Sequence, residues 1–188
     1  MKKSFLLGLV CTVIFSSSVF AQKEYEGNGK DMGVAINPVG VLFNWVSAEV
    51  NLWQIDRTAE INIPIQYMHN PFGLEDDDYD LNIFAIGVQY RKFFSERQEG
   101  FFVQAGWQYA NFGVDGKEEF NNRSSDGNVN SILFGLGYRI ISQSNGLFWA
   151  AALSAGKSWG TIEDPDGGEI SGSGFAYDID FFKIGYSW

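Results

Sequence analysis

The sequence has little sulfur, histidine or positive charge. Its 188 residues include one cysteine, Cys11, and one histidine, His69. A single cysteine excludes an intrachain disulfide, and it also excludes metal sites that need several thiolates. The chain has 13 Lys and Arg residues against 23 Asp and Glu residues, a formal charge of -10. Because phosphate backbones need a basic surface, we predict no nucleic-acid partner.

Long hydrophobic runs are also missing. The main apolar run, residues 5–15, is shorter than the roughly 20 residues of a membrane-spanning helix. It follows Lys2 and Lys3 and precedes SSSVFA, with Val19 and Ala21 where a signal peptidase requires small residues. This pattern is typical of a cleaved secretory signal. We therefore predict a signal peptide over residues 1–21 and one domain over residues 22–188.

What the sequence does contain is alternation. Apolar and polar or small residues alternate with a period of two in eight segments, which predicts eight β-strands. The expected strands are 32–43, 46–55, 59–68, 81–93, 101–112, 130–141, 147–159 and 177–188. Most are close to the roughly 9 to 11 residues with which a tilted strand crosses a bilayer.

The connections between these segments alternate in length. Three are short, at 56–58, 95–100 and 142–146, and three are long, at 70–80, 114–129 and 161–174. An up-and-down barrel with an even number of strands collects its short turns at one end and its long loops at the other. The fold class predicted is therefore all-β: an eight-stranded antiparallel up-and-down transmembrane β-barrel. Its termini are expected in the periplasm and its long loops outside the cell.

The two faces of each strand differ in size as well as polarity. In segment 81–93, Phe84, Ile86, Val88 and Tyr90 alternate with Ala85, Gly87, Gln89 and Arg91. Since eight strands enclose a space only just wide enough for side chains, the small and polar face must point inward and the bulky face toward lipid. Aromatic residues are expected at two rims, one set being Phe43, Trp45, Tyr67, Phe112 and Trp159, the other Trp53, Phe93, Phe101, Trp149 and Trp188.

Charged residues on the inward face predict a packed polar lumen. The inward positions include Glu49, Glu60, Arg91, Arg139 and Lys183, and the hairpin register places Glu60 opposite Arg91. We expect an ion-pair network supported by Gln66, Gln89, Gln104 and Gln108, because charges in a narrow barrel are poorly hydrated. Pro38 and Pro64 fall inside expected strands and predict a local bulge or register defect, because proline lacks the N–H that a sheet needs.

Two stretches resemble a known family. The end of the chain, FFKIGYSW, alternates Phe182, Ile184, Tyr186 and Trp188, and resembles the C-terminal signature that the barrel assembly machinery reads in bacterial outer-membrane proteins. The stretch GVAINPVGVLFNWVSAEVNL, residues 33–52, is similar to the start of small porin-like outer-membrane β-barrels of the Bacteroidota. The resemblance implies a Gram-negative outer membrane. The expected partners are outer-membrane lipids, lipopolysaccharide and the assembly machinery. The resemblance is compatible with a monomer.

No residue pattern predicts catalysis, a metal site or a cofactor. His69 stands at a rim without a neighbouring serine, and GKS at 156–158 lies in an expected strand rather than in a phosphate loop. The acidic loop residues Asp76, Asp77, Asp78, Glu163, Asp164, Asp166 and Glu169 leave calcium binding as an alternative. We expect a structural or interaction protein and no enzyme. The alternatives are a narrow pore for small solutes or hydrophobic compounds and an enzyme that modifies lipid A or phospholipid.

Overall fold

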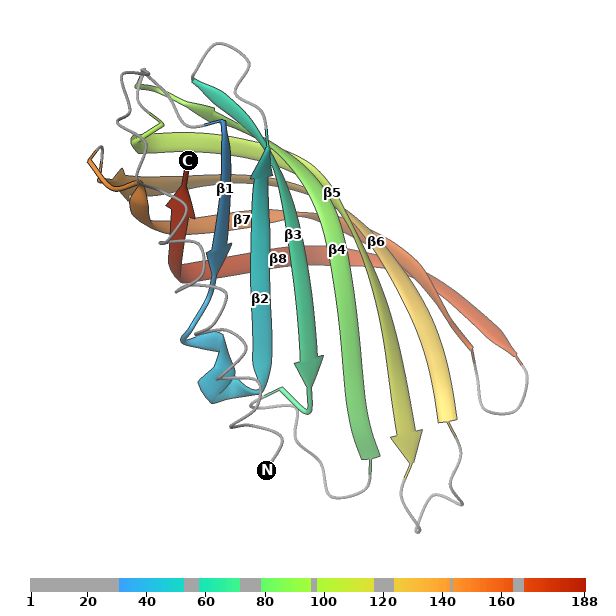
Figure 1. The fold of residues 1–188 in the computed structure, drawn as a ribbon. Coiled ribbons are helices and arrows are strands. Elements are labelled where there is room, and N and C mark those ends of the chain that lie inside the picture. Colours follow the sequence, from blue (N-terminus) through green and yellow to red (C-terminus); the bar gives the residue numbers. More distant parts are fainter. Residues whose placement is uncertain are drawn as a thin grey trace.

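The chain forms one closed antiparallel barrel in a computed structural model that describes residues 31–52, 58–71, 79–95, 98–116, 124–142, 144–163 and 168–188 (Figure 1). Each strand pairs with its neighbours in sequence, and β1 also pairs with β8. The predicted all-β fold, an eight-stranded antiparallel up-and-down barrel, is confirmed. The strands are β1 (Met32–Ile36), β2 (Trp45–Leu52), β3 (Ala59–His69), β4 (Tyr79–Phe93), β5 (Gly100–Gly116), β6 (Ser124–Ile141), β7 (Leu147–Glu163) and β8 (Glu169–Ser187).

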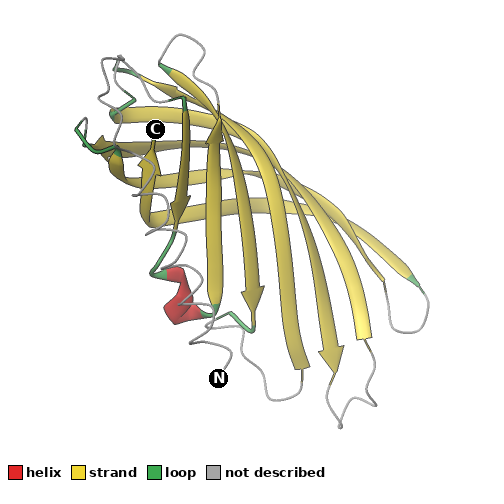
Figure 2. Cartoon of the chain, in the orientation of Figure 1, coloured by secondary structure: helices red, strands yellow, loops and turns green. Residues whose placement is uncertain are grey.

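The first strand is much shorter than expected. β1 ends at Ile36, and the predicted second half of the 32–43 strand is instead a turn followed by the 3-10 helix η1 (Gly40–Phe43), red in Figure 2. The Asn37 side-chain oxygen accepts hydrogen bonds from the backbone N–H groups of Val39 and Gly40, both at 3.1 Å. Pro38 has no N–H to offer a strand partner, so this side-chain turn replaces the sheet hydrogen bonds there.

Within the described residues, no helix is both long and apolar enough to cross a membrane.

The second proline leaves the register intact, contrary to the expected defect. Asn62 pairs with Gln89 and Ile65 with Ile86, so the β3–β4 register is the same on both sides of Pro64. The residue across from Pro64 at that register is Gly87, where an added Cβ would lie 3.3 Å from Pro64 Cγ. The missing side chain of glycine makes room for the proline ring. Among the described strands, a register shift lies instead between β7 and β8, at Ala150 and Ala152.

Two of the expected long loops are mostly strand. β5 and β6 remain paired out to Asp115 and Ser124, and β7 and β8 remain paired out to Glu163 and Glu169. The Gly, Ser and Asn residues of these stretches favour turns locally, but the sheet hydrogen bonds offered by the neighbouring strand override that preference. Strands β4 to β8 therefore extend well beyond the ends of β2 and β3 (Figure 1).

The predicted inward and outward faces are confirmed. Val88 is 46% exposed, whereas the next residue, Gln89, is 5% exposed, and the same alternation follows β3 to β7. Three aromatics assigned to the rims lie on the inward face. Phe93 is buried inside the barrel, Phe112 lies over Gly127, and Trp45 has the inward parity of Ser47 on β2. All three follow from strand parity, which outweighs their position near a strand end. Trp53 lies outside the described residues.

Close strand contacts at glycine generate a test of the fold. At Gly156 an added Cβ would overlap the carbonyl oxygen of Ile132, whereas at Gly172 it would meet nothing within 4 Å. We expect Gly156→Ala to destabilise the barrel by about 1 to 3 kcal/mol through overpacking, and Gly172→Ala to leave it unchanged. Urea unfolding of the refolded protein, followed by tryptophan fluorescence, measures both. Equal midpoints would contradict the β6–β7 packing.

Candidate functional site

A buried group of charges crosses the lumen near the end that carries the short turns. Glu60 on β3 lies between two arginines: Arg91 Nη1 donates to Glu60 Oε1 at 2.7 Å, and Arg139 donates to Oε1 and Oε2 at 2.7 and 2.8 Å. Arg91 comes from β4 and Arg139 from β6, so one carboxylate joins three strands. Glu60 and Arg91 are direct cross-strand partners, as the hairpin register predicts.

A second carboxylate extends this group toward β8. Glu49 on β2 accepts from Lys183 Nζ at 2.6 Å and lies 3.5 Å from Arg91 Nη1. Lys183 also contacts Asp180 Oδ2 at 2.6 Å. Glu49, Glu60, Arg91, Arg139, Asp180 and Lys183 are all buried and are called the lumen cluster below. The structure thus brings together all five charged residues named from the sequence and adds Asp180.

Aromatic rings flank both guanidinium groups. Arg91 stands 4.6 Å from the centre of the Phe102 ring, and Arg139 lies between Phe93 at 4.8 Å and Phe148 at 4.5 Å. Phe93 and Phe102 also contact each other, at 5.2 Å between ring centroids. A cation over an aromatic face recovers part of the interaction that it loses when it leaves water. The rings also fill the barrel's cross-section at the level of the cluster.

Neutral polar side chains continue the network outward. Gln104 accepts from Arg91 Nε at 3.1 Å and donates to Ser154 at 2.8 Å. Gln108 donates to Gln66 at 3.3 Å, farther along the lumen, and Asn62 donates to Asn51 at 2.8 Å. Of the four glutamines expected around the charges, Gln104 contacts the cluster directly, Gln66 and Gln108 bond to each other, and Gln89 is buried on the inward face of β4.

The sequence did not predict that Asp178 and Asp180 of β8 lie on the inward face. Between Ala150 and Ala152 of β7 one residue faces two of β8, Phe181 and Phe182, and both of these rings are exposed. This bulge reverses the parity of β8, so Asp180 and Lys183 both point inward although three positions separate them. The sequence does contain a sign of this bulge. Tyr177, Ile179 and Phe181 alternate with Asp178 and Asp180, and this alternation is out of phase with that of Phe182 and Ile184.

The C-terminal residues close the ring on its outer surface. Phe182, Ile184 and Trp188 are exposed, and the rings of Tyr186 and Trp188 stack at 5.9 Å. The Trp188 carbonyl accepts from the N–H groups of Asp31 and Met32, at 3.0 and 3.1 Å, and its own N–H donates to the Met32 carbonyl at 2.9 Å. Backbone hydrogen bonds therefore hold the last residue against the start of β1.

His69 is an exposed rim residue. Its Nδ1 lies 2.8 Å from Asn82 Oδ1, which also accepts a hydrogen bond from the Tyr67 hydroxyl at 3.2 Å. The described residues contain no cluster of three or more His, Cys, Asp or Glu able to hold a metal ion. Of the acidic residues weighed for calcium, Glu163 and Glu169 are described and exposed, and the other five lie outside the described residues.

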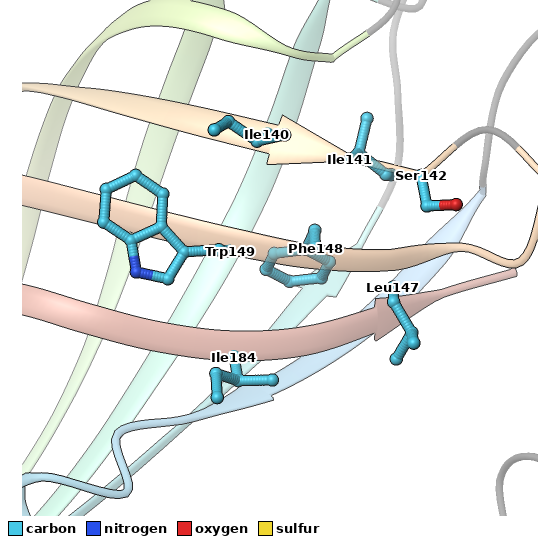
Figure 3. Close-up of a pocket in the computed structure, with 7 residues that line it drawn as sticks. All are labelled: Ile140, Ile141, Ser142, Leu147, Phe148, Trp149 and Ile184. Carbon is cyan, nitrogen blue, oxygen red and sulfur yellow. The ribbon is translucent and has the colours of Figure 1, made fainter.

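A shallow hollow of about 400 Å³ lies at the short-turn end of β6, β7 and β8. Figure 3 shows the seven residues that line it, Ile140, Ile141, Ser142, Leu147, Phe148, Trp149 and Ile184. None of these side chains titrates near neutral pH, so the hollow offers no group for acid–base chemistry.

Comparisons with known proteins found likenesses at the level of structure. The crystal structure of a major outer membrane protein from Thermus thermophilus aligns with 84% of this chain and 97% of its own, at 8% sequence identity and a TM-score of 0.46. No protein-family model matches the sequence. No curated protein matches it either.

The Glu60 contacts predict a large cost for removing its charge. Glu60→Gln leaves two buried guanidinium groups with too little negative charge, so we expect a loss of about 3 to 5 kcal/mol in unfolding free energy. Glu169→Gln, at an exposed position, is the matched control and should change stability by less than about 0.5 kcal/mol. Urea denaturation of both variants measures the difference. A Glu60→Gln protein as stable as the control would show that the cluster does not hold the barrel together.

Proposed function

We propose that this protein is an integral outer-membrane β-barrel with a packed polar lumen, acting as a structural or interaction protein. The observation that carries the proposal is the lumen cluster. Its six buried charged side chains, together with the rings of Phe93, Phe102 and Phe148 that contact its arginines, fill the barrel's interior. A cluster whose charges are already paired offers a passing ion few free ligands, and it leaves little room for a water path.

The outer surface supports a membrane location. Large apolar side chains are exposed along β3 to β8, including Phe84, Phe134 and Leu136. On successive strands this band gives way to outward polar residues, namely His69, Asn82, Asn111 and Asn130. Tyr67 and Trp107, just inside that boundary, donate to Asn82 and Asn130, each at 3.2 Å. Aromatic residues bridging apolar and polar zones are typical of a membrane interface.

The proposed orientation follows from connection length. The start of β1, the end of β8 and the connections β2–β3, β4–β5 and β6–β7 share one end of the barrel. Outer-membrane barrels keep short turns in the periplasm, so we place both termini there and the extended ends of β4 to β8 outside. Lipids and lipopolysaccharide would then contact the apolar band, and the assembly machinery would read the C-terminal strand.

A conductance measurement separates a closed barrel from a pore. We expect refolded protein in planar bilayers to show no steady single-channel current, because the lumen cluster occupies the narrow section. A known porin in the same bilayer is the positive control. Large, stable currents would move the function to a pore for small solutes.

A lipid-modifying enzyme would need a nucleophile or a general base at the lipid-facing rim. There His69 Nδ1 contacts Asn82 Oδ1, an amide oxygen that can orient an imidazole but is not a nucleophile. Assay of refolded protein for lipid A deacylation and phospholipid hydrolysis tests this alternative.

The outward face generates a prediction about lipid. Leu136→Arg places a charge in the middle of the apolar band and should cost about 2 to 4 kcal/mol. Thr161→Arg, on the outward face of β7 beyond Trp159, is the matched control and should cost about 0 to 1 kcal/mol. Unfolding of both variants from lipid vesicles measures the contrast. Equal costs, or recovery of the wild type in the soluble periplasm, would overturn the membrane location.

A further inference from the structure

The contact between the first and last strands is the weakest part of the ring. β8 has 19 residues, but only four of them, Ile184 to Ser187, pair with β1. Residues 169–183 of β8 pair with β7, and no described strand lies along their other edge. Phe175, Tyr177 and Phe181 are 71 to 74% exposed, whereas large apolar residues of β2 to β7 reach at most 64%. This edge of the barrel is called the seam.

The chain after β1 does not fill the seam. Asn37 donates its backbone N–H to the Ser47 carbonyl at 3.0 Å, and its side chain then folds residues 39–43 into η1. Gly40 packs against the backbone of Trp45, where an added Cβ would lie 2.7 Å from the Trp45 carbonyl oxygen. These contacts hold the segment against β2, and among the described residues no strand pairs with residues 169–183 of β8 on that side (Figure 1).

Behind the seam, the inward face carries polar atoms without partners. Asp180 Oδ1 and Ser47 Oγ are each buried and make no hydrogen bond within the described structure. Ser47 and Gln66 are cross-strand partners on β2 and β3, and the Gln66 side chain lies within hydrogen-bonding reach of Asp178 of β8. Unpartnered buried polar atoms are costly, and two such oxygens on the inward face indicate a missing donor. Asp178, Asp180, Ser47 and Gln66 are called the seam site.

The charges point to a cation. The described inward residues at this level and in the lumen cluster include four carboxylates, Glu49, Glu60, Asp178 and Asp180, against three cations, Arg91, Arg139 and Lys183. One formal negative charge is therefore not balanced, and it lies at the end of the cluster that adjoins the seam. A primary ammonium has three N–H donors for a carboxylate, a hydroxyl and an amide oxygen.

We propose that the seam site binds the ammonium head group of an amphiphile, whose apolar chain leaves through the seam along Phe181 and Phe175. The head group lies between Asp178 and Asp180 and donates to Ser47. The exposed rings at the β8 edge cover the first part of the chain, and the rest lies in lipid. This inference rests on the proposed membrane location of the barrel, and it adds a ligand to it.

The test compares three probes on refolded wild-type protein in neutral detergent: dodecylamine, butylamine and dodecanoate. Isothermal titration calorimetry should show saturable binding of dodecylamine. Butylamine lacks the chain and dodecanoate has the wrong charge, so each should bind at least about tenfold more weakly, a difference of about 1.4 kcal/mol. Equal binding of dodecanoate would overturn the ammonium assignment, and equal binding of butylamine would show a free amine site without use of the seam.

Variants locate the site. Asp178→Asn should weaken dodecylamine binding at least about tenfold, because a charge-assisted hydrogen bond is lost. Asp178→Lys should abolish binding, because the ammonium group of the new lysine would occupy the place of the ligand's head group. Asp126→Asn, at an exposed position of β6, is the control and should bind like the wild type. Unchanged binding in both Asp178 variants would overturn the proposal.

Folding of each protein is checked by heat-modifiable gel migration, which reports the closed barrel independently of any ligand. A folded wild-type barrel that binds no dodecylamine refutes the seam site and leaves the proposed function standing. A chain that does not form a heat-modifiable barrel refutes the proposed function itself. If either variant fails to fold, the probe comparison on the wild type still decides.

Discussion

The interaction on which the rest of this structure depends is the contact of one carboxylate, Glu60, with two guanidinium groups. Eight strands leave an interior that must be filled, and here it is filled with charge and aromatic rings rather than with aliphatic side chains. Arg91 and Arg139 come from different strands, so their shared acceptor fixes β3, β4 and β6 relative to one another. Buried charges of this kind stabilise a fold only when each is paired, which makes the arrangement specific.

That packing also explains the distribution of side-chain size around the barrel. Large inward residues such as Phe102 and Phe148 lie opposite glycines: an added Cβ at Gly137 or Gly185 would overlap their rings. Small residues on one strand therefore provide space for the rings and guanidinium groups of another. The outward face has no such limit, and it carries bulky residues on every strand.

Much of the fold could be predicted because a period of two is visible in the sequence. The strand count, the face of Glu60 and the pairing of Glu60 with Arg91 all follow from parity and from one hairpin register. The two-residue period gave a wrong prediction where a local bulge or turn interrupted the strand. The bulge at Phe181 and Phe182 hid Asp180, and the Asn37 turn ended β1 early. The strand ends of β5 to β8 were missed because their Gly and Ser residues favour turns when the neighbouring strand is not considered.

The hydrogen bonds at the end of the chain bear on how the barrel can form. Gly33 pairs with Ser187, Ile36 pairs with Ile184, and Met32 exchanges hydrogen bonds with Trp188, so the contacts that complete the ring join residues 148 to 156 positions apart. Contacts this distant in sequence carry the largest loop-closure entropy and form late. Seven hairpin contacts can form locally, but the ring closes only once residues 184–188 are available to pair with β1. Until then both edges of the sheet lack partners, so at the proposed membrane location folding of this chain would be coupled to its entry into lipid.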